Sequence, residues 1–283
     1  MKKTNTFILL LIVSLCWLQV VNAQQVVKIL AIGNSFSTDA AESYVDDLAK
    51  ADGVKLIIAN MYIGGCSLER HWLNADKDSA AYSYRKIVNG DTTFVAKQKL
   101  KTAIQDEEWD YITFQQASPY SGLMDSYFPY LPNLLTYTKD LATNPKVQFA
   151  FHQTWAYAAD SKHKGFANYN NDQMQMYQAI VSTVKEAVQK AGIKLVIPSG
   201  TAIQNGRTSF VGDKFTRDGY HLSLGLGRFT AACTWYEFFL KKPVMKNTYI
   251  PPGVSQEEAL VAKKAAHLAV KKPFKVTSME KKK

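Results

Sequence analysis

Short runs rich in β-branched and aromatic residues alternate along this chain with segments of helical periodicity, and this alternation restricts the fold more than any other feature. The predicted strands cover residues 26–32, 54–63, 109–115, 146–152 and 193–198. Apolar spacing of three and four residues predicts helices near residues 38–51, 97–107, 126–143, 172–191 and 223–240. Strands that alternate with helices form a parallel sheet with both faces covered. We therefore expect an α/β fold, namely a three-layer α/β/α sandwich with a five-stranded parallel sheet.

One segment, residues 82–96, departs from this alternation. Two stretches of alternating polar and apolar residues flank Asn89 and Gly90, and an Asn-Gly pair is typical of the type I′ turn that joins two antiparallel strands. We expect a small β-hairpin inserted between the second strand and the helix before the third. Because the length of the chain suits one large core, residues 24–272 are predicted to form a single domain.

The carboxyl-terminal end is predicted to hold a helix and then a charged tail. Ser255 and Glu258 have the spacing of a capping box, and Pro273 follows the apolar periodicity, so a helix is expected over residues 255–270. Lysines dominate the residues that follow, and we expect 273–283 to be a solvated basic tail.

Residues 1–23 have the pattern of a secretory signal peptide, with two lysines, an apolar run and small residues up to Ala23. The apolar run is too short for a stable membrane span. Leu15 precedes Cys16 where a lipoprotein signal needs a small residue, so a lipid anchor is disfavoured. We expect an exported protein, periplasmic or secreted, without stable insertion in the membrane.

The formal net charge of +10 is concentrated at the two ends of the chain. Lys2 and Lys3 belong to the predicted signal peptide, and most of the other excess lysines lie within residues 263–283. The remaining body is close to neutral and has no basic stripe interleaved with aromatic residues. A nucleic acid is therefore not an expected partner.

Two cysteines, Cys66 and Cys233, remain after the predicted signal peptide. Two cysteines are too few for a disulfide scaffold, and their spacing matches no zinc motif. They could pair in an oxidising compartment, but we favour two buried thiols.

A serine, Ser35, stands at the junction between the first predicted strand and the helix that follows it, in the sequence Gly-Asn-Ser-Phe-Ser. Open α/β sheets bind their ligands at this carboxyl edge. The free N–H groups at the start of a helix can also stabilise negative charge on a reacting oxygen. Ser35 can therefore act as a nucleophile, although Ser35 or Ser37 can equally serve only to cap the helix.

The strongest chemical signal lies near the other end of the domain, where Asp218 stands three residues before His221 and an apolar helix follows. A serine needs an imidazole to take its proton, and the imidazole needs a carboxylate to hold its tautomer. One short loop can supply both groups. Asp218 could instead be a turn residue and His221 a helix start. With Ser35 at the end of the first strand, the catalytic interpretation is favoured.

Two further histidines, His152 and His163, could suggest a metal site together with His221 and Asp218. Their spacing matches no ligand motif. We therefore expect neither a metal nor any other cofactor.

The blocks around Ser35 and His221 resemble the first and last blocks of the SGNH (GDSL-like) hydrolases, which act on esters, and the likeness spans about residues 28–240. The resemblance implies a flavodoxin-like sheet, with Ser35 as nucleophile, His221 as general base and Asp218 as the acid that orients it. Together with Gln-Gln-Ala-Ser after the third strand and Trp-Ala-Tyr after the fourth, the blocks look like an exported branch of these hydrolases that is typical of Bacteroidetes.

The same resemblance implies an oxyanion hole, which that family builds from the serine N–H, a glycine N–H after the second strand and an asparagine side chain after the third. Gly65 is the favoured glycine and Gly64 the alternative, since neither has a side chain to block a substrate. The asparagine is missing, and a glutamine can donate the same kind of hydrogen bond. Gln115 is favoured over Gln116, so the expected donors are Ser35, Gly65 and Gln115.

The residues expected to bind substrate are Asn34, Trp155 and Tyr157. An exposed Trp155 would let a sugar ring stack on it, although Trp155 could equally lie in the core. We predict a serine ester hydrolase for a small-molecule or glycan ester, most naturally a carbohydrate O-acetyl esterase. The alternatives are a lipase- or thioesterase-type hydrolase on the same triad and a catalytically inactive glycan-binding protein. The sequence does not define the oligomeric state.

Overall fold

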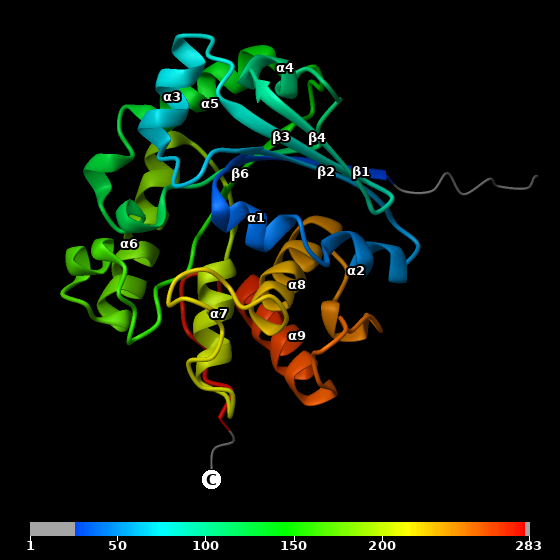
Figure 1. The fold of residues 1–283 in the computed structure, drawn as a ribbon, viewed down its shortest axis with the longest axis vertical. Helices are drawn as coiled ribbons and strands as arrows, with labels where there is room; N and C mark the ends of the chain where they lie inside the picture. Colours follow the sequence, from blue (N-terminus) through cyan, green and yellow to red (C-terminus); the bar gives the residue numbers. More distant parts are fainter. Residues whose placement is uncertain (1–25, 281–283) are drawn as a thin grey trace, which may run out of the picture.

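The computed structural model describes residues 26–280, and Figure 1 shows the path of the chain. The strands are β1 Val26–Gly33, β2 Lys55–Tyr62, β3 Tyr82–Val88, β4 Asp91–Gln98, β5 Tyr111–Phe114, β6 Gln148–His152 and β7 Leu195–Ile197. The α-helices are α1 Ser35–Ala41, α2 Val45–Ala51, α3 Leu68–Asp76, α4 Leu100–Ile104, α5 Tyr130–Leu141, α6 Gln173–Ala191, α7 Ser199–Arg207, α8 Leu226–Leu240 and α9 Gln256–Lys271. The predicted signal peptide and the last residues of the predicted tail lie outside the described residues.

The seven strands form one sheet in the order β4-β3-β2-β1-β5-β6-β7. The strands β2, β1, β5, β6 and β7 are parallel to one another. This confirms the predicted five-stranded parallel core. Counted in chain order, the parallel strands follow the sequence 2-1-3-4-5, which is the flavodoxin-like order.

The predicted hairpin is present as β3 and β4. Asn89 and Gly90 form its turn, and both have positive φ angles, 54° and 87°, as a type I′ turn requires. The hairpin is not a separate insertion, because β3 pairs antiparallel with β2 and places Ile87 opposite Ile58. The sheet is therefore mixed, and the hairpin extends it at one edge.

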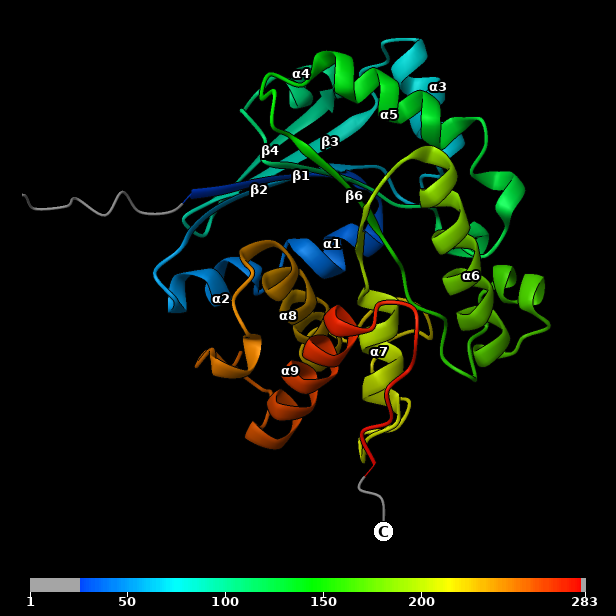
Figure 2. The ribbon, with the colours of Figure 1, turned by 180° about the vertical axis from the view of Figure 1, so that it is seen from behind.

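Helices cover both faces of the sheet (Figures 1 and 2). On one face, α1, α2 and α7 all contact α8, and α9 packs against α7 and α8. On the other face, α5 contacts α3, α4 and α6. This arrangement confirms the predicted three-layer α/β/α sandwich.

Several helices differ from the prediction. The helix expected over residues 38–51 is divided into α1 and α2, because Tyr44 takes a left-handed conformation with φ 62° between them. The helix expected over residues 97–107 is shorter in the structure, where α4 covers only Leu100–Ile104. The helices α3 and α7 are absent from the prediction. All nine residues of α7 are buried, so this helix has no polar face whose periodicity could reveal it.

The last helix begins with the predicted capping box. Ser255 Oγ accepts a hydrogen bond from Glu258 N at 3.2 Å, and Glu258 Oε2 accepts one from Ser255 N at 3.0 Å. After α9 the chain runs along α7, where Thr277 N donates to Asn205 Oδ1 at 2.7 Å. The first part of the predicted solvated tail is thus held against the domain. Within residues 26–280, no helix combines the length and the apolarity needed to cross a membrane.

Both cysteines are buried and unpaired, which confirms the prediction of two buried thiols. Burial raises the pKa of Cys66 to about 12 and the pKa of Cys233 further still. Neither thiol is therefore ionised at neutral pH.

Candidate active site

The connections of the parallel strands reverse direction between β1 and β5. The chain leaves β1 toward β2 on one side and leaves β5 toward β6 on the other. In open α/β sheets, ligands bind in the crevice at the carboxyl ends of two such strands. Ser35 lies there, as the first residue of α1 directly after β1. Asn34 caps this helix by accepting from Phe36 N at 3.0 Å, and the N–H of Ser35 has no partner inside the helix.

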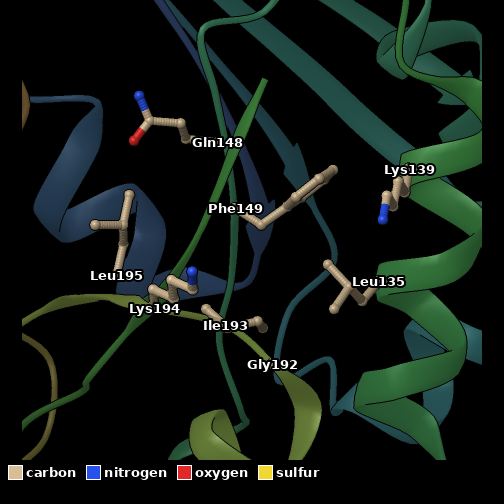
Figure 3. Close-up of a pocket in the computed structure, with 8 residues that line it drawn as sticks. All are labelled: Leu135, Lys139, Gln148, Phe149, Gly192, Ile193, Lys194 and Leu195. Carbon is tan, nitrogen blue, oxygen red and sulfur yellow. The ribbon is translucent and has the colours of Figure 1, made fainter. Parts of the chain in front are cut away.

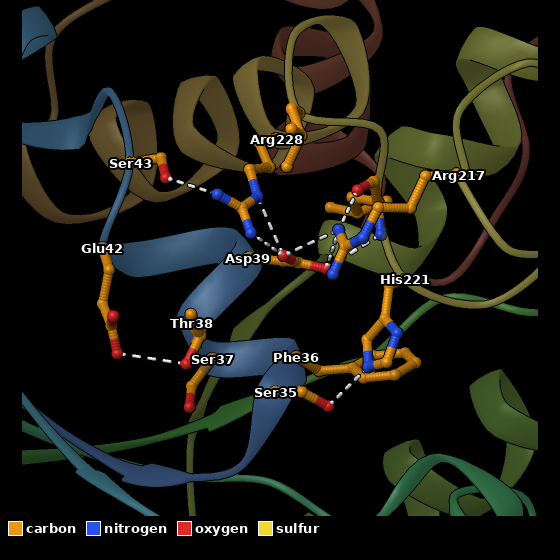
Figure 4. A network of polar contacts seen from close by, with 12 residues as sticks. Ser35, Phe36, Ser37, Thr38, Asp39, Glu42, Ser43, Arg217, His221 and Arg228 are labelled. Atoms are coloured by element: carbon orange, nitrogen blue, oxygen red, sulfur yellow. Dashed lines mark hydrogen bonds and ion pairs between the residues drawn. The ribbon is translucent and has the colours of Figure 1, made fainter. Parts of the chain in front are cut away.

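Ser35, His221 and Asp218 are joined by hydrogen bonds. His221 Nε2 lies 2.9 Å from Ser35 Oγ (Figure 4), and His221 Nδ1 lies 2.7 Å from Asp218 Oδ2. When Nδ1 donates its proton to the carboxylate, Nε2 is free to accept the proton of the serine. The structure therefore brings together the three residues of the predicted triad. Their role in catalysis stays a prediction.

Asp218 is held by the backbone of its own loop. Its Oδ1 accepts from the N–H groups of Tyr220 and His221, at 3.1 and 2.7 Å. Burial acts to raise the pKa of Asp218, but the hydrogen bonds from His221 and Tyr220 outweigh burial and leave this pKa below its ordinary value. Asp218 is thus a carboxylate at neutral pH.

The loop that carries Asp218 and His221 is a narrow turn. Arg217 N donates to His221 O at 2.9 Å and closes it. Gly219 lies near its tip with φ 87°, a conformation that favours glycine. A Cβ atom on Gly219 would also lie 3.0 Å from Ser161 Cα. The close approach of these two segments therefore depends on the glycine.

A buried carboxylate ties this loop to α1 (Figure 4). Asp39 lies four residues after Ser35, on the same face of the helix, and it is 1% exposed. It accepts from Leu222 N at 2.8 Å, from Arg217 Nη1 at 3.2 Å and from Arg228 Nε at 2.8 Å. The helix that carries the candidate nucleophile thus also fixes the loop that carries the candidate base. The sequence analysis missed Asp39, and its spacing from Ser35 is the signal that could have found it.

A pocket of about 320 Å³ lies beside Ser35 and His221. Its other lining residues are Asn34, Phe36, Tyr62, Gly64, Gly65, Ser118, Pro119, His163 and Tyr220. Gly65 has φ 61° and lies in a tight turn that Cys66 N closes by donating to Ile63 O at 3.2 Å. Among the described residues, no group accepts a hydrogen bond from Gly65 N. Its N–H is therefore available to a ligand.

The two glutamines predicted for the oxyanion hole do not line this pocket. Gln115 Nε2 donates to Asn34 Oδ1 at 2.6 Å, and Gln115 Oε1 lies 2.9 Å from His152 Nδ1. Gln116 Oε1 accepts from Leu68 N at 3.0 Å, at the start of α3. Internal hydrogen bonds thus hold both amides, and the prediction of a glutamine donor in the pocket is corrected. Gln115 reaches the pocket only through Asn34.

The predicted sugar-stacking residues are also buried. Trp155 and Tyr157 are both 0% exposed. Trp155 stacks on Phe36 with ring centroids 4.3 Å apart, and its Nε1 donates to Tyr220 O at 2.7 Å. Tyr157 directs its hydroxyl to Ser118 Oγ at 2.8 Å. The prediction of an exposed Trp155 is wrong because α1 covers the ring, and Trp155 instead supports the loop of the candidate base.

His163 lines the pocket, although nothing in its sequence context indicates such a role. Its ring lies 4.8 Å from that of Tyr157 and 4.7 Å from that of Tyr220, between centroids. Its Nδ1 accepts from Gly165 N at 3.0 Å. Burial, and then the nearby imidazole of His221, lower the pKa of His163. His163 is therefore neutral at pH 7.

A second pocket, also of about 320 Å³, lies at the opposite edge of the sheet, where β6 and β7 begin (Figure 3). Leu135, Phe149 and Ile193 supply much of its wall. No serine, cysteine, histidine or carboxylate lines it, so it offers neither a nucleophile nor a base. Throughout residues 26–280, no three His, Cys, Asp or Glu side chains are grouped so as to hold a metal ion.

Solved structures share this fold. A protein from Slackia heliotrinireducens, described as a candidate SGNH hydrolase, superposes with a TM-score of 0.52 at 20% identity, and the match covers 76% of this chain and 99% of that chain. An acetylxylan esterase from Geobacillus stearothermophilus gives a TM-score of 0.48 at 13% identity over 81% of this chain and 98% of its own. No curated protein matches the chain. The protein from Slackia heliotrinireducens thus shares the overall fold of this chain.

The family is shown by closer similarity. Residues 28–269 match the family described as a domain of unknown function, DUF4886. A DUF4886 protein from Bacteroides uniformis ATCC 8492 is 50% identical, with a TM-score of 0.89, and the match covers 90% of this chain and 98% of that chain. The chain belongs to the DUF4886 family.

Proposed function

We propose that this protein is a serine hydrolase that cleaves ester bonds. The observation that carries the proposal is the hydrogen-bonded chain from Asp218 through His221 to Ser35 beside an open pocket. Ser35 Oγ attacks the acyl carbonyl while His221 Nε2 takes its proton. His221 then gives this proton to the leaving alcohol. Water, activated by the same imidazole, releases the acid from Ser35.

The negative charge on the carbonyl oxygen is stabilised by two backbone donors in this proposal, the N–H groups of Ser35 and Gly65. Donors that are fixed before the reaction stabilise such a charge without reorganisation. Asn34 helps to fix the second one, since its Nδ2 donates to the carbonyl of Cys66 at 3.0 Å. Neither Gln115 nor Gln116 donates directly.

We propose an ester of a short acyl group on a carbohydrate as the substrate. Aromatic rings and hydroxyl groups share the lining of the pocket, for example Tyr62, Ser118 and Tyr220, and such a mixture suits a sugar ring. The SGNH-type fold agrees with this class of reaction. A series of p-nitrophenyl esters tests the acyl part, with acetate expected to be the best substrate. A steady rise in activity with chain length would instead favour a lipase- or thioesterase-type enzyme.

The catalytic proposal is tested by p-nitrophenyl acetate hydrolysis with purified wild type and Ser35→Ala. The substitution should lower kcat by at least about 10³-fold, since the nucleophile is lost. A fluorophosphonate probe should label the wild type at Ser35 and leave the variant unlabelled. Equal hydrolysis by both proteins, or a wild type that is neither active nor labelled, would contradict the proposal.

Export is part of the same proposal. The signal-peptide pattern of residues 1–23 places cleavage after Ala23. Amino-terminal sequencing of the protein recovered from the cell envelope or the medium should therefore begin at Gln24. A product that retains Met1 and stays in the cytoplasm would contradict export and would leave the ester hydrolysis untouched.

A further inference from the structure

His163 is a second imidazole in the pocket, and the proposed hydrolysis does not use it. The ring of Tyr220 adjoins both imidazoles, with its centroid 4.7 Å from that of His163 and 4.2 Å from that of His221. His163 therefore lies on the side of the pocket where His221 stands. Because His221 hands its proton to the leaving oxygen, this is the side that the alcohol part of an ester occupies.

The hydrogen bonds of His163 define which of its nitrogens carries the proton. Nδ1 accepts from Gly165 N at 3.0 Å, so the neutral ring has its proton on Nε2. Among the described residues, no group accepts from this Nε2–H. A donor left without a protein partner in a ligand pocket is available to an oxygen of the ligand.

The segment that carries His163 is packed firmly against another wall of the pocket. A Cβ atom on Gly165 would lie 2.4 Å from Pro119 Cβ, so the two backbones are in close contact. Asn168 Nδ2 donates to Pro119 O at 2.9 Å. The ring of Tyr157 packs against His163 as well, at 4.8 Å between centroids. The direction of the Nε2–H is therefore fixed before a ligand binds.

We propose that the Nε2–H of His163 donates a hydrogen bond to a hydroxyl or ring oxygen of a sugar on the alcohol side of the ester, with the ring of Tyr220 as the adjoining apolar wall. This inference rests on the proposed ester hydrolysis and names the alcohol that the site selects. A sugar offers acceptor oxygens to His163 and a C–H face to an aromatic ring. A fatty alcohol or an unsubstituted phenol has no such second oxygen, so this hydrogen bond discriminates against it.

The test compares two acetate esters, a methyl glucoside that carries a single O-acetyl group and p-nitrophenyl acetate. In His163→Phe, the aromatic packing between Tyr157 and Tyr220 is kept while the donor is lost. The ratio of kcat/KM for the sugar ester to kcat/KM for p-nitrophenyl acetate should fall about tenfold, the usual effect of one hydrogen bond. In His163→Gln, an amide N–H reaches the position of Nε2, and the ratio should stay within about threefold of wild type.

Lys164→Ala is the matched control, because Lys164 is exposed and does not line the pocket. Its ratio should equal that of wild type. The inference is overturned if His163→Phe leaves the ratio unchanged, whether both activities stay or fall together. It is also overturned if the wild type hydrolyses p-nitrophenyl acetate but no sugar acetate. A different result would contradict the proposed ester hydrolysis itself, namely a Ser35→Ala variant that retains the wild-type activity on both esters.

Discussion

The side chain of Asn34 makes three hydrogen bonds, which join the segments around the candidate nucleophile. Oδ1 accepts from Phe36 N at 3.0 Å and from Gln115 Nε2 at 2.6 Å, and Nδ2 donates to Cys66 O at 3.0 Å. Burial lowers the pKa of His152 to about 3, so its neutral ring donates from Nδ1 to Gln115 Oε1. The orientation of the Asn34 amide is thus determined from inside the core.

A prediction at the scale of single residues concerns the two glycines of the pocket. Gly65→Ala should lower kcat about 10²-fold, because φ 61° is unfavourable for alanine and the N–H donor is displaced when the turn relaxes. Gly64→Ala is the control. Its φ is not positive, and an added Cβ would meet only the hydroxyl of Tyr62 at 3.4 Å. Steady-state hydrolysis of p-nitrophenyl acetate measures both. A larger loss in Gly64→Ala would assign the donor to the other glycine.

The residues Ser35, Asp218 and His221 could be predicted because triad chemistry depends on residue type and on spacing along the chain. The directions in which the side chains of Gln115 and Trp155 point could not be predicted in this way. Both follow the end of a strand, where a side chain can turn into the pocket or into the core. Which of the two occurs depends on the helix that packs there, and here α1 covers Trp155 with Phe36.

At the scale of elements, α1 has two functions on one face. Its first turn presents Ser35, and its second turn places Asp39 against the loop that carries His221. The helix α1 and the loop of His221 are far apart in the sequence, and one buried carboxylate with two arginines fixes their relative position. Removing one partner of such a group leaves an uncompensated buried charge.

We expect Asp39→Asn to lower the free energy of unfolding by about 3 kcal/mol. It should also lower kcat by about tenfold or more well below the melting temperature, because the imidazole loses its alignment. Glu42→Gln is the control, since Glu42 follows the same helix and pairs with Arg85 at 3.0 Å, away from the loop. Urea unfolding and p-nitrophenyl acetate kinetics separate the two effects. Equal changes in kcat for both variants would show that Asp39 does not position His221.

Complete burial leaves the parallel strands recognisable in the sequence but conceals the helix α7. The parallel strands are recognisable because each is a short apolar run between helical segments. The helix α7 is not, because it is buried on all sides, in contact with α8 and α9, and includes polar residues such as Thr201 and Asn205. Its polar groups bond to the chain end, as Asn205 Oδ1 does with Thr277 N, and no local pattern indicates such a partner.

At the scale of the whole molecule, two buried histidines contribute to the response of stability to acid. Burial lowers the pKa of both His71 and His152 to about 3, from an ordinary 6.5. The unfolded chain binds a proton at each as the pH falls below 6.5, whereas the folded protein does so only near pH 3. The stability that these two neutral rings contribute is therefore fully present above pH 6.5 and is lost progressively below it. When the pH falls from 8 to 5, each histidine should lower the free energy of unfolding by about 2 kcal/mol.

The substitution His71→Gln tests this prediction away from the pocket. A glutamine does not titrate and has a similar size, so it can occupy the buried space beside Tyr82, whose hydroxyl lies 3.0 Å from His71 Nδ1. Urea unfolding at both pH values measures how much the free energy of unfolding decreases from pH 8 to pH 5. This decrease should be about 2 kcal/mol smaller in the variant than in the wild type. The same loss in both proteins would mean that His71 is protonated in the folded state.

The hydrogen bond between Ser35 and His221 joins residues that are 186 positions apart. A nascent chain that has emerged only as far as β7 carries the serine without its base, because the loop of His221 follows α7. In the proposed export, the polypeptide is therefore chemically inert while it is made and threaded through the membrane. Reactivity requires the loop of His221 to be folded against α1, where Leu222 N donates to Asp39, so in this proposal acylated molecules in the cytoplasm are spared.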